Sequence, residues 1–143
     1  MQEKKRILAV DYGERRIGLA ISDAFQWTAR PLETIDRKKS PDTASLIHRI
    51  ILENDVGEIV VGMPFNMDGT KGESSERVEN FVKMLKKIVT CPIFFEDERC
   101  TTLLAHEIIR EMGYNKRIRK RKGKVDQMAA VLILKSYISK KEM

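Results

Sequence analysis

Residues 6–22, RILAVDYGERRIGLAIS, constrain the fold more than any other part of this chain. The first seven residues, RILAVDY, are nearly all apolar and do not alternate, which is typical of a strand buried on both faces. A second apolar run follows after a short turn around Gly13, and the pair predicts an antiparallel hairpin. A strand buried on both faces needs covering layers on both sides, so a sheet between helices is favoured.

The rest of the chain alternates between strand-like and helical patterns. Residues 29–37 predict a third strand, with Pro31 at its start or on an edge. Ser40 is a good helix N-cap, with Pro41 at the first helical position. The later elements are two buried strands, 57–64 and 91–98, and three helices, 74–88, 101–114 and 125–140. This order predicts one α/β domain over residues 1–143, a mixed sheet with helices on both faces.

Length and composition fit a globular domain and give no sign of a membrane segment. The chain has 143 residues, of which 42% are hydrophobic, and no apolar run is long enough to span a bilayer. The first residues lack the features of a signal peptide. The two cysteines, Cys91 and Cys100, have neither disulfide-framework nor metal-ligand spacing. We therefore expect a cytoplasmic protein with two reduced thiols and no membrane partner.

Basic residues are concentrated in one segment. The formal net charge is +6, and residues 115–124, NKRIRKRKGK, contain more Lys and Arg than this whole excess. Such a run is either a solvated loop that needs its charge only for solubility or a binding surface for a polyanion. Composition alone leaves both interpretations open.

Three acidic residues occupy positions where acids are unusual. Asp11 ends the first strand, Glu98 ends the last strand, and Asp126 begins the last helix. Ligands of open α/β sheets bind at the carboxyl ends of the strands, where these residues are expected to meet. Converging carboxylates repel each other unless divalent cations neutralise them, and Mg²⁺ suits carboxylates combined with water and phosphate. Taken singly, Asp126 could simply cap its helix, and Glu98 could pair with Arg99 at the surface.

Four motifs resemble the YqgF family, also called RuvX, of the RNase H-like superfamily: LAVDYGERRIGLAIS, IVVGMPFNMDGTKGE, DERCTT and KGKVDQMAAVLILKSY. The resemblance covers nearly the whole chain. It implies an RNase H-like fold with a five-stranded mixed sheet in the order 3-2-1-4-5. It also implies a Mg²⁺- or Mn²⁺-dependent nuclease, with two ions bound together with substrate, that processes the 5′ end of pre-16S rRNA. Family members have also been named Holliday junction resolvases, by similarity to RuvC.

The resemblance assigns the metal-binding and catalytic roles to Asp11, Glu98 and Asp126. The segment IVVGMP, residues 59–64, carries no acid, unlike its counterpart in the RuvC pattern, so the glutamate must come from the next strand as Glu98, with Asp97 in reserve. Cys100 stands where the family more often has Phe or Leu, and a buried cysteine fills that apolar position without changing the chemistry.

Polar side chains near these acids are the expected nucleic-acid contacts. For the loop at 62–73, a role as a simple turn remains equally open, and the threonines after the last strand could instead be N-caps. The two arginines nearest the acids could either contact the scissile phosphate or hold the carboxylates. The expected contacts are Arg16, Asn66, Asp68, Thr70, Arg99, Thr101, Thr102, Arg119, Arg121, Lys122 and Lys124.

Three rival functions accompany the RNA nuclease. A resolvase of four-way DNA junctions would use the same residues but needs a stable dimer, whereas we expect a monomer or weak homodimer. A phosphotransferase of the actin and hexokinase superfamily also begins with a D-x-G hairpin, here DYG, but binds ATP between two such domains. A catalytically silent nucleic-acid-binding module would keep the acids for structure alone.

Overall fold

The computed structural model describes residues 5–66, 68–98 and 122–142, with the backbone only for residues 122–127. The helix expected at 101–114 lies outside these residues. In chain order the elements are β1 (Arg6–Tyr12), β2 (Arg16–Ser22), β3 (Ala29–Pro31), β4 (Ile35–Asp36), α1 (Thr43–Glu53), β5 (Val56–Met63), α2 (Glu73–Lys86), β6 (Ile93–Asp97) and α5 (Lys122–Lys141).

The six strands form one mixed sheet in the order β3-β2-β1-β5-β6, with the short β4 also paired to β2. Strand β1 runs antiparallel to β2 and parallel to β5, and β5 runs parallel to β6. The predicted order 3-2-1-4-5 is therefore confirmed. The predicted third strand is divided into β3, which ends at Pro31, and β4, and both pair antiparallel with β2.

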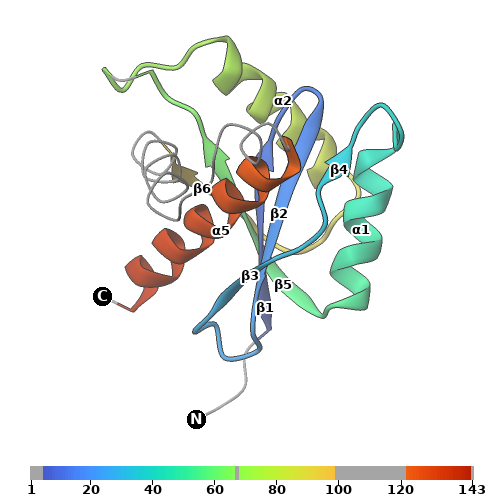
Figure 1. Cartoon of the computed structure of the whole chain (residues 1–143), viewed down its shortest axis with the longest axis vertical. Coiled ribbons are helices and arrows are strands. Elements are labelled where there is room, and N and C mark those ends of the chain that lie inside the picture. The colour runs from blue at the N-terminus through green and yellow to red at the C-terminus, as the bar shows by residue number, and fades with distance from the viewer. Residues whose placement is uncertain (1–4, 67, 99–121, 143) are drawn as a thin grey trace.

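Helices cover both faces of the sheet, as the apolar β1 requires. Figure 1 shows α5 crossing one face while α1 and α2 lie against the other. Alternate residues of β1 enter two separate cores: Leu8 and Val10 pack toward α1 and α2, and Ile7 and Ala9 pack toward α5. All four side chains are fully buried. The central position of β1 therefore places its carboxyl end, with Asp11, in the middle of one sheet edge.

Helix α1 begins later than the sequence predicts. Its N-cap is Asp42, whose Oδ1 accepts a hydrogen bond from the Ser45 amide at 3.3 Å. The predicted cap, Ser40, belongs instead to the turn after β4, where its amide donates to the Asp36 carbonyl at 2.9 Å. Both residues are favourable caps, and the turn that closes β4 decides between them.

The cysteines and the hydropathy of the helices were also subjects of the sequence predictions. Cys91 is a free thiol, and Cys100 lies outside the described residues. None of the helices in the described part of the chain is both long and apolar enough to cross a membrane.

The C-terminal half of α5 is fastened to the sheet by polar contacts. The Tyr137 hydroxyl donates a hydrogen bond of 2.7 Å to Glu58 Oε2, and Lys141 pairs with the other oxygen of that carboxylate. Beside it, Glu96 is almost fully buried and accepts hydrogen bonds from Ser136 and Lys140. These contacts set the position of α5 along its axis, and the start of the same helix carries Asp126.

Replacing Tyr137 with Phe tests how much the hydrogen bond to Glu58 stabilises the packing of α5 on the sheet. The variant keeps the ring that stacks on Phe94 but removes the donor to Glu58, whose carboxylate then has one partner fewer. Burial and the Glu58 carboxylate both raise the pKa of Tyr137, so the hydroxyl stays protonated and donates. We expect Tyr137→Phe to lower the free energy of unfolding by about 1–2 kcal/mol. Urea denaturation checks this, and an unchanged midpoint would contradict it.

Candidate active site

The carboxyl groups of Asp11 and Glu98 meet at one edge of the sheet. Asp11 is the last residue but one of β1 and lies opposite Gly18 of β2. Glu98 follows β6 directly, and its amide donates to the carbonyl of Met63, the last residue of β5. The two carboxyl groups share a hydrogen bond. The structure thus brings together two of the three predicted acids from strands that are far apart in the sequence.

A glycine on the strand between them makes room for this pair. A Cβ atom at Gly62 would clash with Glu98 Oε2 and would lie 2.6 Å from Ile133 Cδ1 of α5. Gly18 likewise leaves no side chain opposite Asp11. The carboxyl groups therefore occupy space that any larger residue at position 62 would fill.

Strand alternation separates Glu98 from the reserve candidate, Asp97. Glu96 of β6 faces α5, where it bonds to Ser136. Successive side chains of a strand point to opposite faces, so Asp97 faces away from α5. Glu98 returns to the α5 side and contacts Asp11. The geometry supports Glu98 as the partner of Asp11.

The electrostatics of the pair suit a cation. Burial raises the pKa of Glu98, and the nearby charge of Asp97 adds to this, while the hydrogen bond from Asp11 opposes it. Two carboxylates can share a hydrogen bond only if one of them carries a proton, and a divalent cation can take the place of that proton. Carboxylate oxygens are the hard donors that Mg²⁺ and Mn²⁺ prefer, so the residues fit the expected metal.

The third predicted ligand, Asp126, is placed by its backbone alone. Figure 1 shows the N-terminal end of α5 near the β1–β2 hairpin, at the edge that holds Asp11. Position 126 lies about one turn before Ala130 and two turns before Ile133, which are both buried against the sheet. Among the residues whose side chains are described, no three His, Cys, Asp or Glu residues are grouped to hold a metal ion.

A hollow of about 210 Å³ opens beside Glu98 and contains residues that the sequence analysis did not single out. Arg77 of α2 reaches into it, and its Nε lies 2.8 Å from Glu14 Oε1 of the hairpin turn. The available signal was position: α2 follows the loop after β5, so its first turns border the same sheet edge. The hollow is lined by Tyr12, Gly13, Glu14, Pro64, Ser74, Arg77, Val78 and Glu98.

The polar residues of the loop after β5 bond mainly to one another. Asn66 Nδ2 donates to Thr70 Oγ1 at 2.9 Å, and the amide and hydroxyl of Thr70 both donate to Asp68 Oδ1. Gly69 has a φ of 88°, which glycine adopts without strain. These bonds account for the residue types as turn formers. Their expected contact with nucleic acid stays a prediction.

The remaining predicted contacts are divided between described and undescribed residues. Arg16 begins β2 two residues before Gly18, so alternation places it on the same face as Asp11. Lys122 and Lys124 lie in the first turn of α5 by their backbone. Outside the described residues lie Arg99, Thr101, Thr102, Arg119 and Arg121.

Replacing Glu98 with Gln tests whether the pair is built for a cation. A Gln amide can donate to Asp11 without a shared proton, so the metal-free variant should be about 1–2 kcal/mol more stable at neutral pH. Conversely, Mg²⁺ at about 100 times its Kd should stabilise the unmodified protein by about 2.7 kcal/mol and the variant far less. Thermal denaturation with and without Mg²⁺ measures both effects. Glu53→Gln, at an exposed ion pair of α1, is the control and should change neither.

Solved structures with a similar fold define the class of fold. The chain is similar to T. thermophilus RuvC in complex with a Holliday junction substrate, with a TM-score of 0.59 at 12% identity over 96% of both chains. It is equally similar to the fowlpox virus resolvase bound to Holliday junction DNA, with a TM-score of 0.59 at 14% identity over 96% of this chain and 99% of that one. The fold is therefore RNase H-like, of the resolvase type.

The family follows from sequence. The profile of the RuvX family, described as Holliday junction resolvase, matches residues 5–140. A relative from Ruminiclostridium cellulolyticum named "Putative pre-16S rRNA nuclease" is 47% identical over 136 residues, 94% of each chain. One of the same name from Halalkalibacterium halodurans is 40% identical over 140 residues, 96% of this chain and 99% of that one. The chain belongs to the RuvX (YqgF) family.

Proposed function

We propose that this chain is a single-domain, divalent-metal-dependent nuclease that hydrolyses phosphodiester bonds in structured RNA and processes the 5′ end of pre-16S rRNA in the cytoplasm. The observation that carries the proposal is the half-buried Asp11–Glu98 carboxyl pair, at the carboxyl ends of β1 and β6 on the α5 side of the sheet. Relatives named for pre-16S rRNA support the choice of substrate.

In this proposal each residue near the pair has a definite task. Asp11 and Glu98 hold Mg²⁺ or Mn²⁺, and Asp126 supplies a third carboxylate from α5. When bound, the metal activates water and stabilises the leaving oxygen of the phosphodiester. Gly62 keeps the space around the carboxyl groups clear. Arg77, which ion pairs with Glu14 and Glu73 hold in place, exchanges one of these carboxylates for a phosphate that enters the neighbouring hollow.

The basic segment then extends the binding surface along the substrate. Residues 115–124 connect to α5, whose first turn includes Lys122 and Lys124. Lysine and arginine contacts to phosphates release condensed counterions, so binding weakens steeply as salt rises. Such contacts position a nucleic acid without reading its sequence.

A DNA junction resolvase is the second candidate, favoured by the family description and by the fold of the RuvC and fowlpox structures. It would require two active sites related by a two-fold axis, hence a stable dimer. A non-catalytic nucleic-acid-binding module is the third possibility, in which the carboxyl pair would have only a structural role.

One cleavage assay separates these candidates. The protein is incubated with Mg²⁺ or Mn²⁺ and, in separate reactions, with a pre-16S rRNA leader fragment and a four-way DNA junction. We expect cleavage of the RNA that stops when EDTA is added. Preferential symmetric cutting of the junction would instead identify a resolvase, and binding without cleavage of either substrate would identify the binding module. Asp11→Asn, purified in parallel, reveals any contaminating nuclease.

A further inference from the structure

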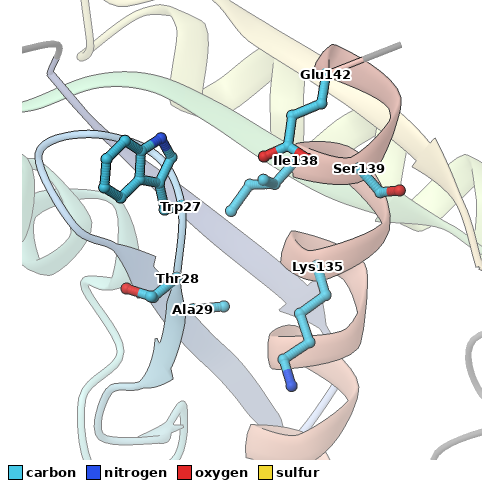
Figure 2. Close-up of a pocket in the computed structure, with 7 residues that line it drawn as sticks. All are labelled: Trp27, Thr28, Ala29, Lys135, Ile138, Ser139 and Glu142. Atoms are coloured by element: carbon cyan, nitrogen blue, oxygen red, sulfur yellow. The ribbon is translucent and has the colours of Figure 1, made fainter. Parts of the chain in front are cut away.

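A groove on the flank of α5 is not used by the active site described above. It lies between the C-terminal half of α5 and the segment that leads into β3, and its volume is about 440 Å³. Figure 2 shows Trp27 above this groove on one side and the α5 side chains on the other, with Lys135 extending along it. Its lining residues are Trp27, Thr28, Ala29, Lys135, Ile138, Ser139 and Glu142.

The aromatic wall of this groove is exposed and held in place. Trp27 is 55% exposed and stacks on Phe25, which is 39% exposed, with 5.3 Å between ring centroids. The Asp23 carboxylate accepts hydrogen bonds from the amides of Trp27 and Thr28, at 2.7 and 2.9 Å. An indole that is exposed while its backbone is fixed offers a flat face to a ligand at little entropic cost.

Gln26, the residue between Phe25 and Trp27, has a strained backbone conformation. Gln26 has a φ of 60°, in the left-handed region that non-glycine residues rarely adopt. Its side chain stabilises this conformation by donating to the Lys5 carbonyl at 2.8 Å and by accepting from Lys141 of α5 at 3.2 Å. Strained backbone supported in this way is concentrated at binding and functional sites.

Lys135 gives the groove one contact for a phosphate group. Lys135 is exposed within it, whereas the side chain of Thr28 hydrogen-bonds to the Asp23 carboxylate. Glu142 carries the one opposing charge among its lining residues, at the end of the groove farther from the start of α5. An aromatic plane beside a positive charge is the combination with which proteins hold single-stranded nucleic acid.

The groove and the proposed active site lie on the same face of the sheet. Both lie along α5, and position 126 precedes Lys135 by nine residues, which is about 13 Å of helix. That distance corresponds to roughly four stacked nucleotides of one strand. A strand whose scissile phosphate lies at Asp11 can therefore reach the groove with nucleotides a few positions away.

We propose that this groove binds a single-stranded segment of the substrate nucleic acid, with one base stacked on Trp27 and its phosphate beside Lys135. The inference rests on the proposed nuclease function for the identity of the strand, but binding can be measured without cleavage.

Trp27 is the only tryptophan of the chain and reports directly on the groove. Titration of the full-length protein with octauridylate, in EDTA to prevent cleavage, should quench its fluorescence. Fluorescence anisotropy of labelled octauridylate should show that Trp27→Ala weakens binding roughly tenfold and Trp27→Phe much less, because Phe retains a stacking face. Lys135→Ala should reduce the salt dependence of binding. Leu52→Ala, at an exposed position on α1, is the matched control.

The outcomes distinguish this inference from the nuclease proposal. Binding without quenching, with Trp27→Ala as tight as the parent, overturns the groove and leaves the nuclease intact; so does failure of octauridylate to bind at all while RNA is still cleaved. Quenching without cleavage of any substrate upholds the groove and overturns the nuclease. Dimerisation that depends on Trp27, seen by sedimentation while oligonucleotide affinity is unchanged, assigns the groove to a second copy and also overturns it.

Discussion

Asp11→Asn is expected to reduce metal-dependent cleavage by at least about a thousandfold. Loss of one carboxylate from the pair removes a charge that holds the metal, and metal assistance contributes several kcal/mol to transition-state stabilisation. Asparagine has nearly the same size and can still hydrogen-bond to Glu98, so the fold should persist. Single-turnover cleavage of the pre-rRNA fragment, with circular dichroism to verify folding, measures the effect.

Asp97→Asn is the matched control for this experiment. Asp97 is also a carboxylate beside Glu98, but it faces the opposite side of β6. We expect its replacement to change cleavage by less than about tenfold, since it acts on the pair only through its charge. Equal losses from both substitutions would show that Asp97 belongs to the site. Full activity of Asp11→Asn would exclude the metal-binding role of the pair.

Gly62→Ala is expected to reduce cleavage by about a hundredfold while the chain still folds. The added methyl group would overlap Glu98 Oε2 and crowd Ile133 Cδ1, and both of these atoms are ends of flexible side chains. They can move aside, so the free energy of unfolding should change by only about 1–3 kcal/mol. Displacing a catalytic carboxylate by about 1 Å, however, can cost a hundredfold in rate.

Gly57→Ala on the same strand is the control that separates displacement of Glu98 from a general loss of stability caused by crowding. A Cβ at Gly57 would also be crowded, at 2.5 Å from Lys5 Cβ, but at the opposite end of β5. Its loss of stability should be at least as large as that of Gly62→Ala, because Lys5 Cβ is attached to the backbone and cannot swing aside, while cleavage is preserved. Denaturation midpoints and cleavage rates of the two variants are compared side by side. If Gly62→Ala cleaves as fast as Gly57→Ala, then Gly62 does not position Glu98.

Much of the fold could be predicted because its signals are local. The nearly continuous apolar run of β1 required cover on both faces, and the separate cores around Leu8 and Ile7 have that arrangement. Periodicity located α1, α2 and α5, whereas the strand order followed from the family resemblance. Prediction failed where two local signals competed: both Ser40 and Asp42 can cap α1, and the turn after β4 decided for Asp42.

For the candidate site as well, the sequence predicted some features and the packing of distant segments decided the others. Sequence by itself determined the residue types: an acid at the end of a buried strand, a second acid after the last strand, and small residues near both. Only the tertiary structure decided which of Asp97 and Glu98 meets Asp11, because the register of β6 against β5 sets the face on which each lies. Arg77 and Trp27 were likewise beyond reach, since their relation to the site and to α5 depends on packing between distant segments. Patterns of a few residues record local geometry, whereas a site is built from contacts that only the folded chain brings together.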